Sequence, residues 1–225
     1  MNKDNFRQLV IVCRDYKIDF NQFINPIYVG VETGIINLLK HNKTMAFICG
    51  DNDTITKQQL SKVIKDKKNL HLESIVFNSV KDQLDSELAI ILALERKLNF
   101  QQIVLVADGT RWDMLMASIN ICLKYQQYNL ILVGENNYCF MLKNNQHYTF
   151  TQHQLTYDYI SFFNYGIQPV IYNFSGCKYY PNQDIIINAN DTQSFSNEFL
   201  ILPNQTPNLK IKQGNCLIFL HKNIR

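Results

Sequence analysis

Short, continuous apolar runs alternate with amphipathic stretches over roughly the first 134 residues, and this alternation constrains the fold more than any other feature of the sequence. The runs are rich in β-branched residues and lack a polar–apolar alternation, which is typical of strands buried on both faces of a parallel sheet. Strands are predicted at 9–13, 27–31, 45–49, 74–77, 103–107 and 130–133. Helical spacing of apolar residues predicts helices at 85–98 and 111–125. The first half therefore predicts an open α/β sheet with right-handed crossovers.

The pattern changes near residue 135, where short strands replace the strand–helix alternation. Turns rich in Asn, Gly, Pro and Gln separate predicted strands at 138–142, 159–164, 170–174, 184–187, 199–202, 209–212 and 216–220. The last two strands, joined through Gly214, are predicted to form a hairpin. Short strands without helical spacing predict a small β-sandwich. The predicted organisation is an α/β domain at 1–135 followed by a β-sandwich domain at 136–225.

The composition of the chain excludes several classes of protein. Hydrophobic residues make up 46% of the chain and charged residues 18%, which excludes intrinsic disorder. The net charge of +3 has no accompanying basic stripe, so neither nucleic acid nor a membrane surface is an expected partner. No apolar run approaches the roughly 20 residues that span a bilayer. The six cysteines are scattered, so we expect reduced thiols and a cytoplasmic protein.

Charged residues follow four successive predicted strands at the point where each strand ends. They are Glu32 after the second strand, Asp51 and Asp53 after the third, Lys81, Asp82 and Asp85 after the fourth, and Arg111 and Asp113 after the fifth. Because ligands bind at the carboxyl ends of parallel strands, we expect these side chains to share one edge of the sheet. Clustered carboxylates suit Mg²⁺, and an arginine beside them suits a phosphate chain. The combination predicts phosphoryl-type transfer from a nucleotide.

Several of these residues also have a purely structural interpretation. Asp82 followed by Asp85 fits a helix N-cap with an acidic third position. Asp51 and Asp53 fit an Asx-type turn, and Thr110 fits the cap of the helix that follows it. Capping and turns account for single positions, but not for acidic residues on successive loops of one sheet edge. The sequence has neither a P-loop motif nor a dinucleotide-binding glycine motif, which leaves metal and arginine to bind the phosphates.

Six short motifs occur in a fixed order in both halves of the chain, from about residue 30 to residue 215. They are Glu32-Thr33-Gly34, Gly50-Asp51-Asn52-Asp53-Thr54-Ile55, Lys81-Asp82-Gln83-Leu84-Asp85-Ser86-Glu87-Leu88-Ala89, Gly109-Thr110-Arg111-Trp112-Asp113, Ser175-Gly176-Cys177-Lys178-Tyr179 and Ser196-Asn197-Glu198. This order resembles the thiamine pyrophosphokinase family, whose pattern reads roughly D-x-G, G-D-F-D-S-I, K-D-Q-T-D-x-E-L-A, G-G-R-x-D-H, S/T-G-F-K-Y-P-L and S-N-E.

The resemblance implies an enzyme that transfers a pyrophosphoryl group from ATP to thiamine, giving thiamine diphosphate and AMP. It implies a nucleotide-binding α/β domain, a thiamine-binding β-sandwich, and a homodimer with its active sites at the subunit interface. The implied catalytic residues are Asp51, Asp53, Asp82, Asp85, Arg111 and Asp113, of which the first four hold Mg²⁺. The implied ATP contacts are Glu32, Lys81, Gln83 and Arg111, and the implied thiamine contacts are Asp113, Ser196, Asn197 and Phe219.

Departures from the family pattern keep other functions open. Leu84 stands where the family has Thr, Thr110 replaces the second Gly of its motif, and Met114 replaces a His. These changes favour a diverged protein that binds nucleotide or thiamine without transfer, whereas the retained carboxylates favour an enzyme. A third interpretation is a Mg²⁺-dependent nucleotide phosphohydrolase, which uses water in place of the thiamine hydroxyl.

Overall fold

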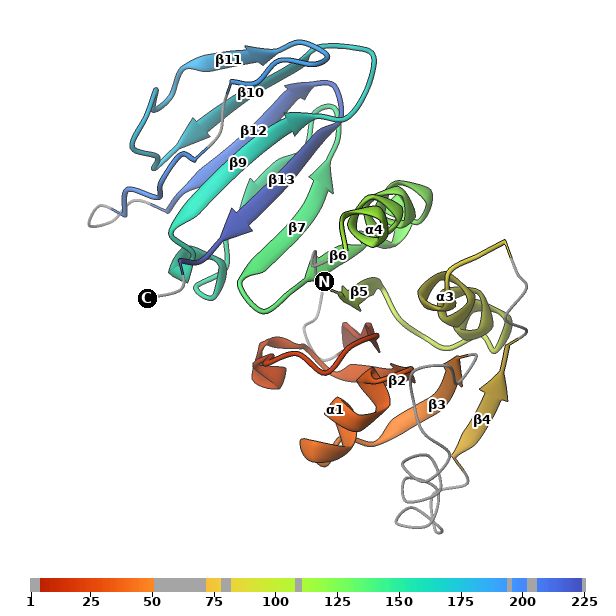
Figure 1. Ribbon diagram of the computed structural model, residues 1–225. Coiled ribbons are helices and arrows are strands. Elements are labelled where there is room, and N and C mark those ends of the chain that lie inside the picture. Colours follow the sequence, from red (N-terminus) through yellow and green to blue (C-terminus); the bar gives the residue numbers. More distant parts are fainter. Residues whose placement is uncertain are drawn as a thin grey trace. The chain divides into compact units, whose positions relative to one another are not determined.

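The computed structural model describes residues 5–50, 72–77, 82–107, 111–193, 196–201 and 206–223 (Figure 1). The chain divides into two compact units, Met1–Glu135 and Asn136–Arg225. This division falls at the point where the sequence changes from strand–helix alternation to short strands.

A parallel sheet forms the framework of the first unit, with the strand order β4-β3-β2-β1-β5-β6 (Figure 1). The neighbouring strands in this order run parallel. The strands are β1 (Gln8–Val12), β2 (Pro26–Val31), β3 (Met45–Gly50), β4 (Glu73–Val76), β5 (Gln102–Val106) and β6 (Ile131–Val133). The predicted parallel α/β sheet is therefore confirmed.

The central strands are buried along their length, which explains why their sequences do not alternate. All residues of β1 are buried, and its four apolar residues are fully shielded from solvent. Strand β4 lies at the edge, and its Val76 is 64% exposed. Burial on both faces is what a parallel sheet covered by helices requires.

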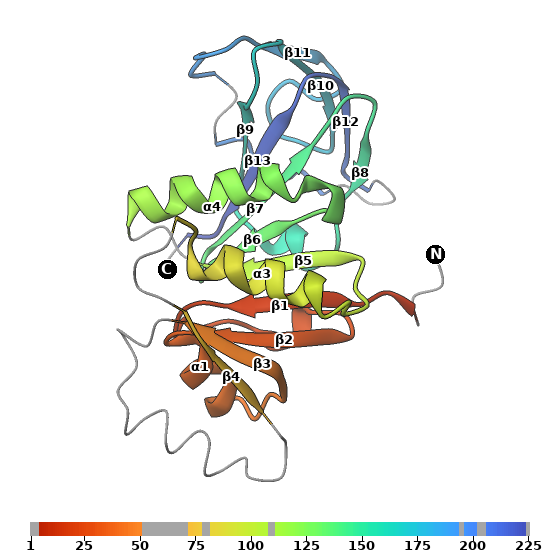
Figure 2. The same cartoon turned by 90° about the vertical axis from the view of Figure 1, so that its right-hand side faces the viewer.

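Helices flank this sheet on both faces (Figure 2). They are α1 (Gly34–Lys40), α3 (Asp85–Glu95) and α4 (Trp112–Lys124), and short 3-10 turns lie at η2 (Phe20–Gln22) and η3 (Gln126–Tyr128). Helix α1 lies on one face, and α3 and α4 lie on the other. The direction of winding reverses at β1, because β2 and β3 lie to one side of it and β5 and β6 to the other. In open α/β sheets, ligands bind at such a reversal.

Antiparallel strands form the second unit, in the orders β7-β13-β9 and β11-β10-β12-β8 (Figure 1). The strands are β7 (Asn137–Leu142), β8 (His147–Thr149), β9 (Tyr159–Asn164), β10 (Val170–Ser175), β11 (Asp184–Ile187), β12 (Asn208–Gln213) and β13 (Cys216–His221), with a 3-10 turn η4 (Gln154–Thr156). Aromatic rings pack between these strand sets: Phe162 of β9 stacks on Tyr172 of β10 with 4.3 Å between centroids. Phe140 of β7 and Tyr148 of β8 are 4.6 Å apart. These rings form the core of the second unit.

The predicted hairpin between the last two strands is wrong. Strand β12 pairs with β10 and β8, whereas β13 pairs with β7 and β9. The turn between them does contain a glycine with a positive φ, Gly214 at 83°. A Cβ atom on Gly214 would lie 2.6 Å from the carbonyl oxygen of Pro169, so the turn packs closely on the β9–β10 connection. The turn residues therefore specify a change of direction, whereas packing decides that β13 pairs with β7 and β9 and not with β12.

Two other parts of the second unit differ from the prediction. Strand β8 falls outside the predicted strands. Around residue 199 the chain forms an isolated bridge between Cys177 and Phe199 in place of the predicted strand at 199–202, of which residue 202 lies outside the described residues. Within the described ranges, no helix is long and apolar enough to cross a membrane.

Candidate functional site

Most of the predicted site residues lie in parts of the chain that the structure describes. They are Glu32, Asp82, Gln83, Asp85, Arg111, Asp113, Ser196, Asn197 and Phe219. Asp51, Asp53 and Lys81 lie outside the described residues.

The ends of β2 and β3 meet through a carboxylate and a glycine. Glu32 follows β2 with a φ of 49° and is 8% exposed. A Cβ atom on Gly50, the last residue of β3, would lie 1.9 Å from the Glu32 Oε1 atom. The absence of a side chain at Gly50 therefore creates the space that the Glu32 carboxylate occupies. This contact places Glu32 at the carboxyl edge of the sheet, as the sequence predicts.

Asp85 lies at the same edge as Glu32. Burial raises the pKa of the Cys13 thiol to about 12; nearby Arg14 opposes this, and the carboxylates of Asp85 and Glu32 add to it. Burial is also the main cause of the raised pKa of Cys49 in β3, and both carboxylates again contribute. The two carboxylates therefore act on the same pair of thiols, so the structure brings Glu32 and Asp85 into one region.

Helix α3 begins with acidic residues and has a leucine at its N-cap position. Its N-cap residue is Leu84, whose φ of −67° and ψ of 150° are extended, and the Leu84 side chain makes no capping hydrogen bond. Asp82 is therefore not the N-cap, and that structural interpretation is wrong. Asp85 and Glu87 occupy the first turn, where negative charge is favourable because of the helix dipole.

The N-terminus of α4 carries a salt bridge between two predicted site residues. Arg111 is the N-cap residue, and its Nη2 atom lies 2.5 Å from Asp113 Oδ2. Its Nε atom donates a second hydrogen bond to Asp113 Oδ1 at 3.2 Å. Hydrogen bonding to Arg111 lowers the pKa of Asp113, and the same bond raises the pKa of Arg111. Both side chains are exposed, so an incoming anion can compete for Arg111.

Helices α3 and α4 are joined by a contact that sequence reasoning did not identify. Glu87 is 9% exposed, and its Oε1 atom accepts hydrogen bonds from Lys124 Nζ at 2.5 Å and from the Tyr125 hydroxyl at 3.3 Å. The hydrogen bond to Glu87 raises the pKa of Lys124. Glu87 belongs to the motif that contains Asp85, and it ties the start of α3 to the end of α4.

Predicted thiamine-contacting residues gather around β9 in the second unit. Phe219 of β13 is half-buried and lies directly opposite Ser161 of β9. Its ring meets that of Phe163 edge-on, with 5.3 Å between centroids. The backbone N–H of Ser196 donates a hydrogen bond to Ser161 Oγ at 3.0 Å. Ser161 and Phe163 were not predicted, and their alternate positions place them on one face of β9.

The Asn197 side chain makes hydrogen bonds to the backbone of its own unit. It is 9% exposed, and its Oδ1 accepts a hydrogen bond from the Tyr179 N–H at 3.1 Å. Its Nδ2 donates to the Tyr179 carbonyl at 3.0 Å. Beside it, Lys178 Nζ and Glu198 Oε1 form a salt bridge at 2.8 Å. The structure therefore shows Asn197 fixing the 177–180 segment, and its contact with thiamine stays a prediction.

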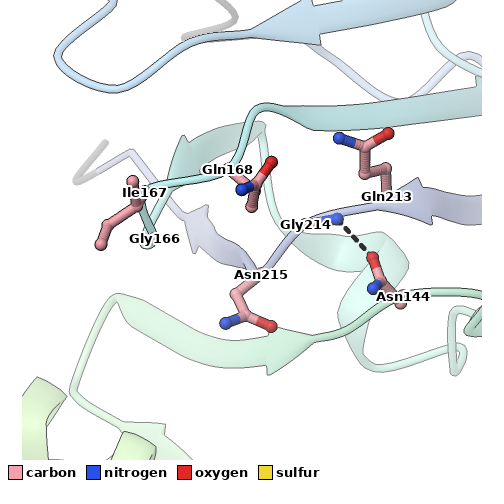
Figure 3. A pocket seen from close by; sticks show the side chains of 7 residues that line it. All are labelled: Asn144, Gly166, Ile167, Gln168, Gln213, Gly214 and Asn215. Carbon is pink, nitrogen blue, oxygen red and sulfur yellow. Dashed lines mark hydrogen bonds between the residues drawn. The ribbon is translucent and has the colours of Figure 1, made fainter.

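A pocket of about 750 Å³ lies among the turns of the second unit (Figure 3). It is lined by Asn144, Gly166, Ile167, Gln168, Gln213, Gly214 and Asn215, and Asn144 accepts a hydrogen bond from the Gly214 N–H. The lining contains no carboxylate and no cation. This pocket therefore does not match the chemistry that the motifs indicate.

The donors available for a metal at the carboxyl edge are hard oxygen atoms. Among the described residues, no group of three or more His, Cys, Asp or Glu side chains is arranged to hold a metal ion. Asp82 and Asp85 are two of the four predicted ligands, and the other two lie outside that part of the chain. Carboxylate oxygens are the ligands that suit Mg²⁺, so the chemistry of the donor set fits this ion.

Comparisons with known proteins agree on one family. The family model described as thiamin pyrophosphokinase, catalytic domain, matches residues 23–133. The chain is 28% identical over 178 residues to the thiamine pyrophosphokinase of Bacillus subtilis, covering 78% of this chain and 79% of that protein.

Solved structures carry the same name and share the fold. The Bacillus subtilis crystal structure has a TM-score of 0.77 at 21% identity, covering 97% of this chain and 100% of that one. Thiamin pyrophosphokinase from Candida albicans has a TM-score of 0.75 at 15% identity, covering 98% and 90% of the two chains. The family model, a curated relative aligned over most of both chains and the fold shared along nearly the whole chain all support the thiamine pyrophosphokinase family for this protein.

Proposed function

We propose that this protein is a thiamine pyrophosphokinase, which transfers a pyrophosphoryl group from ATP to the hydroxyl group of thiamine. The products are thiamine diphosphate and AMP. The observation that carries this proposal is that Glu32 and Asp85 lie in one region at the carboxyl edge of the parallel sheet, in a chain whose first half matches the family model. Acidic groups at that edge are what a metal–nucleotide complex requires.

The first unit, 1–135, is proposed to bind ATP with Mg²⁺. Asp51, Asp53, Asp82 and Asp85 are assigned to the metal, and Glu32, Lys81, Gln83 and Arg111 to the nucleotide. When bound, Mg²⁺ would neutralise charge that develops on the phosphate oxygens. The α/β topology supports this assignment, because the winding reverses at β1 and ligands of open α/β sheets bind at such a reversal.

The proposed transfer forms one bond and breaks one. The hydroxyl oxygen of thiamine attacks the β-phosphorus, and the bond between that phosphorus and the oxygen bridging it to the α-phosphate breaks, releasing AMP. The hydroxyl proton passes to solvent. Because the transition state is loose, the residues act mainly by positioning and by neutralising charge. Arg111 would exchange the Asp113 carboxylate for phosphate oxygens, which frees Asp113 to face the positively charged thiazolium ring.

The second unit, 136–225, is proposed to be a β-sandwich that binds thiamine through Ser196, Asn197 and Phe219. The aromatic rings packed between its strand sets support the sandwich description. An aromatic face is favourable for a cationic ring, and Phe219 with Phe163 offers one. The family resemblance supports a homodimer with active sites at the subunit interface. Free thiols at the six cysteines, five of them buried, support a cytoplasmic location.

Two variants on helix α3 test the proposal. Asp85→Asn should lower the rate of thiamine diphosphate formation by about 100-fold or more, because it removes a charge aimed at the metal–phosphate complex. Glu95→Gln is the matched control, since Glu95 is an exposed carboxylate in the last turn of the same helix. It should keep the wild-type rate. Equal rates in wild type and Asp85→Asn, with both proteins folded, would show that the site is elsewhere.

A further inference from the structure

Arg14 lies directly beyond the central strand of the parallel sheet. Val12, the last residue of β1, pairs with Gly30 of β2 on one side and Val106 of β5 on the other. The Cys13 N–H then donates a hydrogen bond to the Val106 carbonyl at 3.1 Å. Arg14 is the next residue, so it leaves the sheet at the carboxyl edge where the winding reverses.

The backbone around Arg14 is held in place by helix α1. Asn37 is 1% exposed, and its Nδ2 atom donates hydrogen bonds to the carbonyls of Arg14 at 3.2 Å and Tyr16 at 2.8 Å. Lys40 of the same helix forms a salt bridge with Asp15. The buried Asn37 amide therefore holds the backbone of the loop after β1, while the Arg14 side chain is exposed. A fixed backbone with an exposed cation is suited to ligand binding, because little further ordering is needed.

The charge of Arg14 is available to a ligand. Its guanidinium makes no hydrogen bond or salt bridge to any residue that the structure describes. Arg111 differs, because it is paired with Asp113. Arg14 nevertheless belongs to the acidic region, since it acts on the Cys13 thiol together with Glu32 and Asp85. Carboxylates can hold a metal ion that binds part of a phosphate chain. The phosphate oxygens not bound to the metal remain hydrogen-bond acceptors, and a neighbouring guanidinium can donate to them.

We propose that Arg14 donates hydrogen bonds to the phosphate chain of the bound nucleotide at the carboxyl end of β1. The identity of the anion as ATP rests on the proposed function, whereas the location of the anion site rests on the fold around Arg14. The planar guanidinium presents several donors that match phosphate oxygens in pairs, which a lysine cannot reproduce.

The test compares three variants by calorimetric titration with ATP in the presence of Mg²⁺ and without thiamine. Arg14→Gln should weaken ATP binding roughly 10- to 100-fold, the range expected for hydrogen bonds to a charged group. Arg14→Lys should weaken it less, because charge remains but paired donation is lost. Lys17→Ala removes an exposed cation from the same loop and should leave the affinity unchanged. Thiamine affinity and the unfolding midpoint should stay at wild-type values in all three proteins.

The outcomes separate this inference from the proposed function. Wild-type ATP affinity in Arg14→Gln would overturn the inference, whether or not the wild type makes thiamine diphosphate. An affinity loss in Lys17→Ala equal to that in Arg14→Gln would also overturn it, because only general charge would then matter. If wild type binds ATP but makes no thiamine diphosphate, and Arg14→Gln binds weakly, the proposed function fails and the anion site stands. A second titration with inorganic pyrophosphate should show the same order of affinities.

Discussion

At the scale of single residues, the contact between Gly50 and Glu32 sets the shape of the carboxyl edge. The Glu32 carboxylate occupies the position where a side chain on residue 50 would begin, at 1.9 Å from an ideal Cβ. Glu32 also adopts a positive φ of 49°, which is uncommon for a residue with a side chain. Such backbone strain persists where surrounding structure enforces it and is frequent at functional sites.

Gly50→Ala should displace the Glu32 carboxylate. We expect the free energy of unfolding to fall by about 1–3 kcal/mol, because an added methyl group in filled space forces its neighbours to move. ATP affinity should fall with it. Gly166→Ala is the matched control, since the nearest atom to its Cβ would be 3.7 Å away, an ordinary contact. Denaturant unfolding measures the stability of both variants, and titration with ATP measures their affinity. Equal stability of Gly50→Ala and Gly166→Ala would contradict the Gly50–Glu32 contact.

At the scale of elements, strands were easier to predict than helices or strand partners. Long apolar runs such as the one in β1 identify strands because burial on both faces dictates the residue type. The seven-residue helix α1 was missed because it is too short for a clear periodicity. The partners of β12 and β13 were predicted wrongly, since turn residues such as Gly214 specify local direction and packing selects the neighbour.

Leu84→Thr should stabilise helix α3. Leu84 occupies the N-cap position with an extended backbone but supplies no capping hydrogen bond. A threonine hydroxyl there can accept from a backbone N–H of the first turn, so we expect a gain of about 1 kcal/mol in the free energy of unfolding. Leu84→Ala measures the separate effect of losing the leucine side chain. If Leu84→Thr is no more stable than Leu84→Ala, the N-cap assignment is incorrect.

At the scale of the whole molecule, the sequence motifs predicted that charged residues gather at the carboxyl edge of the parallel sheet. They did not predict every residue that contributes there. Strand ends carry charged residues in order along the chain, so Glu32 and Asp85 could be placed together from topology alone. Glu87 and Ser161 could not be assigned, because their roles depend on a neighbouring helix or strand. Arg14 was missed for the same reason, since its fixed backbone depends on Asn37 of α1.

The thiols report on the integrity of the whole fold. Burial raises the pKa of Cys13 to about 12 and raises those of Cys122 and Cys216 as well. A raised thiol pKa in the folded state means that ionisation favours unfolding, so stability should decline as the pH rises above about 8.5, where unfolded thiols ionise. At pH 8 a thiol reagent should react slowly with the native protein and with all six cysteines after denaturation. Fewer than six reactive thiols in denaturant without reductant would contradict the free-thiol state.

The most direct measurement of the central claim is the yield of AMP from purified protein with ATP and Mg²⁺, with and without thiamine. We expect AMP and thiamine diphosphate in equal amounts when thiamine is present, and no AMP when it is omitted. AMP or ADP formed at the same rate without thiamine would contradict transfer and indicate a phosphohydrolase. Absence of nucleotide turnover, with ATP and thiamine still bound, would contradict the enzyme and indicate a binding protein.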